Sequence, residues 1–64
     1  MIINGEEYKT ATPITLQDLL QQRGWDLNRV AVELNGNVVS KQDYALTNLS
    51  ESDKLEIVSF VGGG

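Results

Sequence analysis

The chain has 64 residues, a formal net charge of −4, and neither cysteine nor histidine. This length allows a single small domain, and the missing cysteines exclude a disulfide framework. Without histidine or a thiol, the chain lacks the usual groups for zinc binding, acid–base catalysis and nucleophilic attack. We therefore expect neither an enzyme nor a metal site.

The acidic charge also argues against a nucleic-acid partner, because binding to phosphates needs clustered basic residues. No apolar run is long enough to span a bilayer, and no basic-then-apolar leader opens the chain. We expect a cytoplasmic protein with no membrane association.

Residues 1–10 predict a β-hairpin. The apolar run Met1-Ile2-Ile3 is followed by Asn4-Gly5, a pair that favours a type I′ turn, and residues 7–10 return as a second strand. A helix follows, with Thr15 as its N-cap and Gly24 just past its end. We expect Trp25 to pack back onto this ending. Three leucines at helical spacing form its apolar stripe: Leu16, Leu19 and Leu20.

The second half predicts further strands. Residues 30–34 alternate apolar and polar, and Asn35-Gly36 turns the chain toward the apolar pair Val38-Val39. Residues 40–53 read as a loop with one helical turn near 42–46. Four apolar residues are expected to pin this loop to the core: Tyr44, Ala45, Leu46 and Leu49.

The last strand is predicted over residues 54–61. Its alternation assigns Leu55 and Ile57 to the core and Val58 and Phe60 to the outer face. Val58, Phe60 and Val61 form a candidate partner-docking patch. The alternative is that Phe60 only covers the sheet edge. Taken together, the order of elements predicts an α+β fold with one main helix on a mixed sheet of four to five strands.

Three glycines end the chain: Gly62, Gly63 and Gly64. Glycine has no Cβ, so such a run can enter a slot too narrow for a side chain. We expect a flexible arm over residues 62–64 attached to a domain over residues 1–61. A frayed end without function is the alternative.

The sequence resembles the ThiS family of ubiquitin-like β-grasp proteins. The resemblance covers essentially the whole chain. Its most specific residues are Val32-Glu33-Leu34-Asn35-Gly36 with Val38-Val39, and Asp53-Lys54-Leu55-Glu56-Ile57-Val58 with Val61-Gly62-Gly63-Gly64.

The resemblance implies a sulfur carrier of thiamine biosynthesis. An E1-like adenylyltransferase of the ThiF type would use ATP and Mg²⁺ to adenylate the carboxylate of Gly64. A persulfide, supplied for example by a cysteine desulfurase, would convert it to a thiocarboxylate. The sulfur would then pass to a ThiG-type thiazole synthase. Gly62 and Gly63 would thread the partners' active sites, and the chain itself would bind no cofactor. We expect a monomer when it is free.

Three other interpretations remain open. The small subunit of molybdopterin synthase shares the fold, the tail and the chemistry. A ubiquitin-like modifier or adapter would use Gly64 without sulfur transfer. A plain interaction domain would have an accidental glycine tail.

Overall fold

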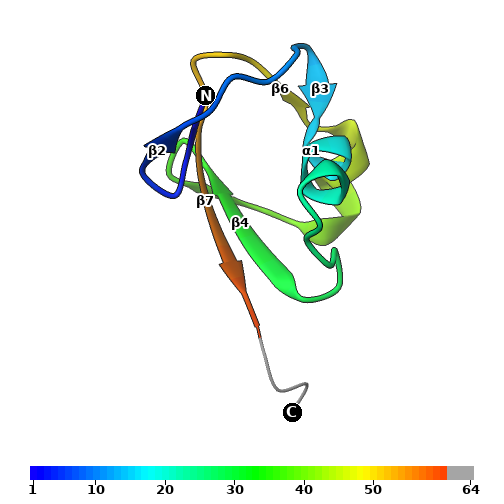
Figure 1. Ribbon diagram of the computed structural model, residues 1–64. Helices are drawn as coiled ribbons and strands as arrows, with labels where there is room; N and C mark the ends of the chain where they lie inside the picture. The colour runs from blue at the N-terminus through cyan, green and yellow to red at the C-terminus, as the bar shows by residue number, and fades with distance from the viewer. Residues whose placement is uncertain (61–64) are drawn as a thin grey trace.

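A five-stranded mixed sheet forms the frame of the computed structural model, which describes residues 1–60 (Figure 1). Its strands are β1 (Ile2–Ile3), β2 (Glu6–Glu7), β4 (Val30–Leu34), β5 (Asn37–Val39) and β7 (Lys54–Ser59). The other elements are the helix α1 (Leu16–Gln22), the 3₁₀ helix η1 (Lys41–Leu46) and two short strands that pair with each other, β3 (Ile14–Thr15) and β6 (Asn48–Leu49).

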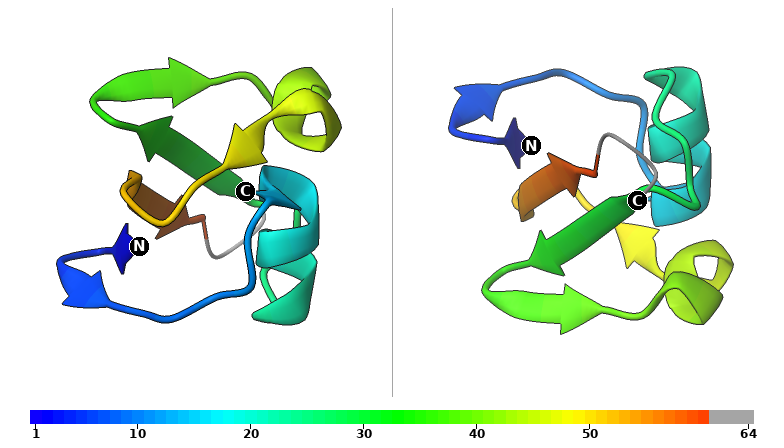
Figure 2. Two further views of the ribbon diagram at one scale, coloured as in Figure 1. Left: turned by 90° about the horizontal axis from the view of Figure 1, so that it is seen from above. Right: turned by 90° about the horizontal axis from the view of Figure 1, so that it is seen from below.

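The sheet has the order β2-β1-β7-β4-β5, so the last strand lies at its centre. β7 runs parallel to β1 and antiparallel to β4. α1 and η1 lie on one side of this sheet (Figure 2). This is the β-grasp arrangement, and it confirms the predicted α+β fold with one main helix on a mixed sheet.

Both predicted ends of α1 are confirmed. Thr15 Oγ1 accepts a hydrogen bond from the backbone N–H of Asp18 at 3.1 Å. At the other end, the N–H of Gly24 donates to Gln21 O at 3.1 Å and that of Trp25 to Leu20 O at 2.9 Å. These two bonds, with Gly24 at φ +78°, define a Schellman ending. Trp25 is half-buried against the core, as expected.

The core lies between α1 and the sheet and is almost entirely aliphatic. Leu16, Leu20 and Leu55 are fully buried. The remaining buried side chains are Met1, Ile3, Leu19, Val30, Val32, Tyr44, Leu49 and Ile57. No polar or charged residue among residues 1–60 is buried, so the described fold depends on apolar burial rather than on internal ion pairs. Within the same residues, no helix is long and apolar enough to cross a membrane.

The predicted anchoring of residues 40–53 is only half correct. Tyr44 and Leu49 are buried, but Ala45 and Leu46 are exposed. The reason is that residues 41–46 form a 3₁₀ helix, which has three residues per turn and turns a narrow face inward. Tyr44 occupies that face and leaves its neighbours in solvent.

Candidate functional site

The candidate site is the carboxyl end of β7, where the central strand leads toward the terminal glycines. Val58 and Phe60 belong to the described residues. Val61, Gly62, Gly63 and Gly64 lie outside them, so the predicted arm and its boundary at residue 61 stay predictions.

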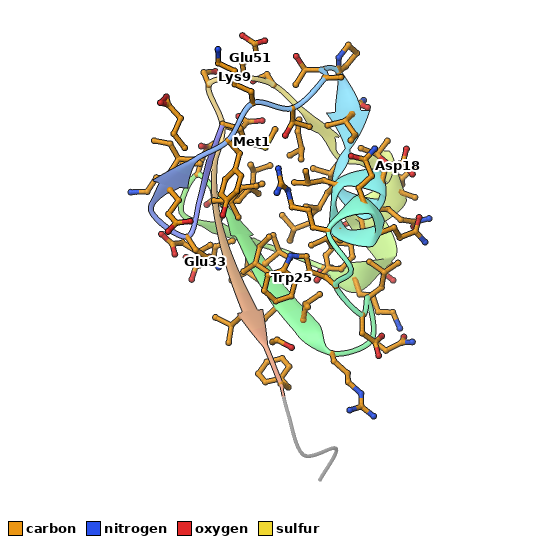
Figure 3. All side chains as sticks on the ribbon, in the orientation of Figure 1. Met1, Lys9, Asp18, Trp25, Glu33 and Glu51 are labelled. Atoms are coloured by element: carbon orange, nitrogen blue, oxygen red, sulfur yellow. The ribbon has the colours of Figure 1, made fainter. Side chains whose placement is uncertain are left out.

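The predicted faces of β7 are confirmed. Leu55 and Ile57 point into the core, whereas Val58 is 57% and Phe60 58% exposed. The alternative role of Phe60 as an edge cover stays open, because β1 pairs only with Lys54 and Leu55 and β4 alone accompanies β7 as far as Ser59. Figure 3 shows the two sides of the sheet: Trp25 lies on the helix side and Glu33 on the opposite side.

The open side of the sheet, opposite α1, is called here the outer face. Ala31 of β4 lies directly opposite Val58 on it. Val38 of β5 lies opposite Glu33 and is 78% exposed, and Ile2 of β1 is 38% exposed. The outer face therefore offers apolar side chains from four adjacent strands to a partner.

A tight turn before β4 fixes the backbone at Phe60, whose N–H donates to Arg29 O at 2.6 Å. In that turn Asp26 Oδ1 accepts from the N–H of Asn28 at 2.9 Å, and Asp26 O accepts from the N–H of Arg29 at 2.9 Å. The exposed side chains of Arg29 and Asp26 form an ion pair at 3.6 Å. These contacts fix the backbone at the end of β7 as far as Phe60, the last residue that the structure describes.

Two asparagine side chains hold the backbone of β7. Asn4 Oδ1 accepts from Ile57 N at 2.7 Å, and Asn4 Nδ2 donates to Ile57 O at 3.1 Å. From the other side, Asn35 Oδ1 accepts from Lys54 N at 2.9 Å. Sequence reasoning treated both asparagines as turn residues and missed this role. No local signal could have shown it, because the partner of each asparagine lies far away in the sequence, 53 residues for Asn4 and 19 for Asn35.

Asp53, just before β7, belongs to the same support. Its Oδ1 accepts a hydrogen bond from Asn35 Nδ2 at 3.0 Å, and its Oδ2 accepts one from Ser50 N at 2.8 Å. The bond from Asn35, with the bonds from Ser50, holds the pKa of Asp53 below its ordinary value. Asp53 therefore stabilises the loop that enters the strand.

The described site supplies apolar surface and backbone contacts. Among residues 1–60, no three acidic side chains gather closely enough to hold a metal ion. Tyr44 has a raised pKa because it is buried, and its hydroxyl donates to Val30 O at 3.4 Å inside the core. The site can present the end of β7, a strand held by several hydrogen bonds, to a partner beside the apolar outer face.

Comparison with known proteins identifies the family. The family model described as the ThiS family matches residues 1–64. The chain belongs to the ThiS family. It is therefore a member of the sulfur carrier family of thiamine biosynthesis, as the sequence resemblance indicates.

Relatives agree with this assignment. The chain is 38% identical over 63 residues to the sulfur carrier protein ThiS of Bacillus subtilis, covering 97% of this chain and 96% of that one. The crystal structure of ThiS from Geobacter metallireducens matches with a TM-score of 0.77 and 29% identity, covering 98% of this chain and 96% of that one. That match supports the β-grasp fold.

A longer relative is a thiazole synthase of Paramagnetospirillum magneticum. It is 45% identical over all 64 residues, but the chain spans only 20% of its length. A thiazole synthase of Magnetococcus marinus is 42% identical over 62 residues, which span 19% of that protein. In both relatives, a ThiS-like segment is part of a much longer chain.

Proposed function

We propose that the chain carries sulfur as a C-terminal thiocarboxylate on Gly64 for the synthesis of the thiazole of thiamine. The observation that carries this proposal is the ThiS family match over residues 1–64, which includes all three terminal glycines. The chain acts as a co-substrate of partner enzymes and not as a catalyst.

Activation is needed because a carboxylate is a poor electrophile. In the proposed first step, the Gly64 carboxylate attacks the α-phosphorus of ATP in an E1-like enzyme, with Mg²⁺ bound there. An acyl–phosphate bond forms and pyrophosphate leaves. The product is a mixed anhydride with AMP, whose phosphate is a good leaving group.

Sulfur then replaces AMP. The terminal sulfur of a protein persulfide attacks the acyl carbon, the bond to AMP breaks, and an acyl disulfide forms. A thiol then attacks the cysteine sulfur of the donor protein, the S–S bond breaks, and the Gly64 thiocarboxylate leaves. The donor cysteine and the attacking thiol end joined in a disulfide, and these two thiol groups have supplied the two electrons that reduce the transferred sulfur. The chain's lack of cysteine is compatible with this route, because the sulfur is carried on the backbone carboxyl.

The fold suits a carrier. The same acyl group has to enter the adenylating enzyme and then the thiazole synthase, and residues without side chains can enter narrow channels. Gly62 and Gly63 would occupy those channels. Val58, Phe60 and Val61 would dock against the partner surface, beside a strand end that the turn at Arg29 holds in place.

The partners proposed are a ThiF-type adenylyltransferase, a persulfide donor and a ThiG-type thiazole synthase. The two relatives named thiazole synthase support the last of these, because they join a ThiS-like segment to a longer chain. The same relatives favour the thiamine interpretation over the molybdopterin one. We propose further that the chain binds no cofactor of its own, is monomeric when free and works in the cytoplasm.

The test is intact-protein mass spectrometry after incubation with ATP, Mg²⁺, the adenylating enzyme, a persulfide donor and a thiol. We expect a mass gain equal to replacing one oxygen by one sulfur, located in the C-terminal fragment. A variant lacking Gly64 is the control and should not change. Isopeptide-linked conjugates in place of the sulfur gain would point to a modifier, and no change with active enzymes would contradict the proposal.

A further inference from the structure

Two acidic residues lie directly opposite each other on the outer face, Glu33 of β4 and Glu56 of β7. Both side chains are exposed. Side chains in this relation in an antiparallel pair have Cβ atoms about 5 Å apart, and like charges there destabilise a sheet. The next pair on this face toward Phe60 is Ala31 and Val58, about 7 Å further along the strands.

No cation of the described chain compensates this acidic pair. The one ion pair among residues 1–60 joins Arg29 and Asp26 at the end of the strand. Lys54 shares the outer face, two residues before Glu56, but forms no ion pair within those residues. The fold therefore gains no stabilisation from placing Glu33 and Glu56 together.

Exposed apolar side chains border the acidic pair. Val38 lies opposite Glu33 on the β5 side, and Val58 follows Glu56 on β7 toward the strand end. A partner that covers these valines also removes water from the two carboxylates. Desolvated carboxylates require a cation, and a guanidinium, with its fork of N–H donors, can bond both at once.

We propose that a thiazole synthase docks on the outer face, with an arginine of its surface bridging Glu33 and Glu56 and apolar side chains covering Val38 and Val58. The inference rests on the proposed function. It commits to the synthase because two relatives named thiazole synthase carry a ThiS-like segment in the same chain.

The acidic pair would set the orientation of docking. Apolar contact alone is weakly directional, whereas a bidentate ion pair fixes one register. Orientation matters here because four residues follow Phe60, and four extended residues span at most about 14 Å. A carrier docked in another register would direct its acyl group away from the synthase active site. Glu33 and Glu56 are thus positioning residues.

The test compares binding to the thiazole synthase of the same host by isothermal titration calorimetry. The variant E33Q/E56Q keeps side-chain size and removes both charges. The control D43N/E51Q makes the same change in net charge at two exposed residues, in η1 and in the loop before β7. We expect E33Q/E56Q to bind at least about tenfold more weakly than the natural chain, and the control to stay within about twofold.

Two further readouts separate docking from folding. The natural chain should lose affinity steeply with added salt, and E33Q/E56Q should lose much less. The unfolding midpoint of E33Q/E56Q should not fall, because the variant removes a repulsion. Equal affinity of the variant and the natural chain would overturn the inference, as would no binding of the natural chain. A variant that loses adenylation but keeps synthase binding would assign the face to the adenylating enzyme and overturn it too.

The proposed function fails by a different result. If the natural chain gains sulfur at Gly64 while E33Q/E56Q binds normally, only the docking inference is wrong. If the natural chain never gains sulfur with active enzymes, the carrier proposal is wrong, and the binding comparison still decides whether the acidic pair docks the synthase.

Discussion

The side-chain amide of Asn4 pairs with both backbone groups of Ile57, accepting from its N–H at 2.7 Å and donating to its carbonyl at 3.1 Å. Backbone pairing of β1 with β7 ends just before this point, where Asn4 N donates to Leu55 O at 2.9 Å. The chain then turns away at Asn4-Gly5. The side chain of Asn4 therefore supplies the hydrogen bonds that a longer β1 would have made.

Replacing Asn4 by glycine tests this contact. Glycine keeps the positive φ of 52° that the turn needs but removes both hydrogen bonds. The N–H and C=O of Ile57 are left unpaired, so we expect the free energy of unfolding to fall by about 1–3 kcal/mol. Urea denaturation followed by circular dichroism measures it. The control Asn37→Ala, in the edge strand β5, should change it by less than about 0.5 kcal/mol. Equal effects of the two changes would contradict the assigned role.

Gly24→Ala tests the end of α1. A Cβ at Gly24 would meet no atom within 4 Å, so the cost is confined to the backbone at φ +78°. We expect a loss of about 1–2 kcal/mol in unfolding free energy. Gly24→Asn should lose less, because asparagine tolerates this conformation better. If Gly24→Ala lowered the unfolding free energy as much as the truncation of a buried leucine to alanine, Gly24 would have a role beyond ending α1.

Asp53 gives the stability a pH dependence. Its pKa in the folded chain lies below the ordinary value of 3.8 because Asn35, with Ser50, donates to the carboxylate. The unfolded chain therefore binds this proton more readily, and the stabilisation is present above that ordinary value and lost as the pH falls toward the folded pKa. The difference in unfolding free energy between the natural chain and Asp53→Asn should be largest near pH 7 and shrink by about pH 3. A constant difference would contradict this.

Phe60→Asp tests the docking patch. Phe60 is 58% exposed, and its backbone bond to Arg29 does not need the ring, so the fold should survive. The variant loses an apolar contact and places a new charge in the interface, so it should bind the adenylating enzyme about tenfold or more weakly. The control is Leu46→Asp, which also replaces an exposed apolar side chain by a carboxylate; Leu46 is 77% exposed on η1, on the helix side of the sheet. Unchanged affinity of Phe60→Asp would remove Phe60 from the interface.

Gly63→Ala tests the proposed arm. A methyl group in a channel shaped for glycine should displace the reacting carboxylate, and a displacement of this order costs about a hundredfold in rate. We expect thiocarboxylate formation to slow accordingly while the unfolding midpoint stays unchanged. Mass spectrometry over time and thermal denaturation measure the two. If stability fell as much as transfer did, residue 63 would be structural.

Local signals account for what the sequence predicted correctly. The ends of α1 depend on Thr15 and Gly24, each within a few residues of the bonds it makes. The faces of β7 follow from its own alternation, so the exposure of Val58 and Phe60 could be predicted without knowing their neighbours.

The features that were missed depend on distant residues or weak patterns. Nothing near Asn4 in the sequence points to Ile57, which is 53 residues away. The facing of Glu33 and Glu56 depends on the register between β4 and β7. β3 and β6 have two residues each, too few for a periodic signal. Leu46 was misplaced because an apolar residue in a short helical turn does not reveal which way that turn faces.

The central position of β7 also determines the order in which the molecule can be built. Without β7, the five-stranded sheet is reduced to the hairpins β1-β2 and β4-β5, and isolated two-stranded hairpins are marginally stable in water. The sheet closes only when a strand more than 50 residues from β1 inserts between them. A chain whose synthesis has not reached β7 therefore cannot form the docking face, so partners that need this face select chains in which β7 is already inserted in the sheet.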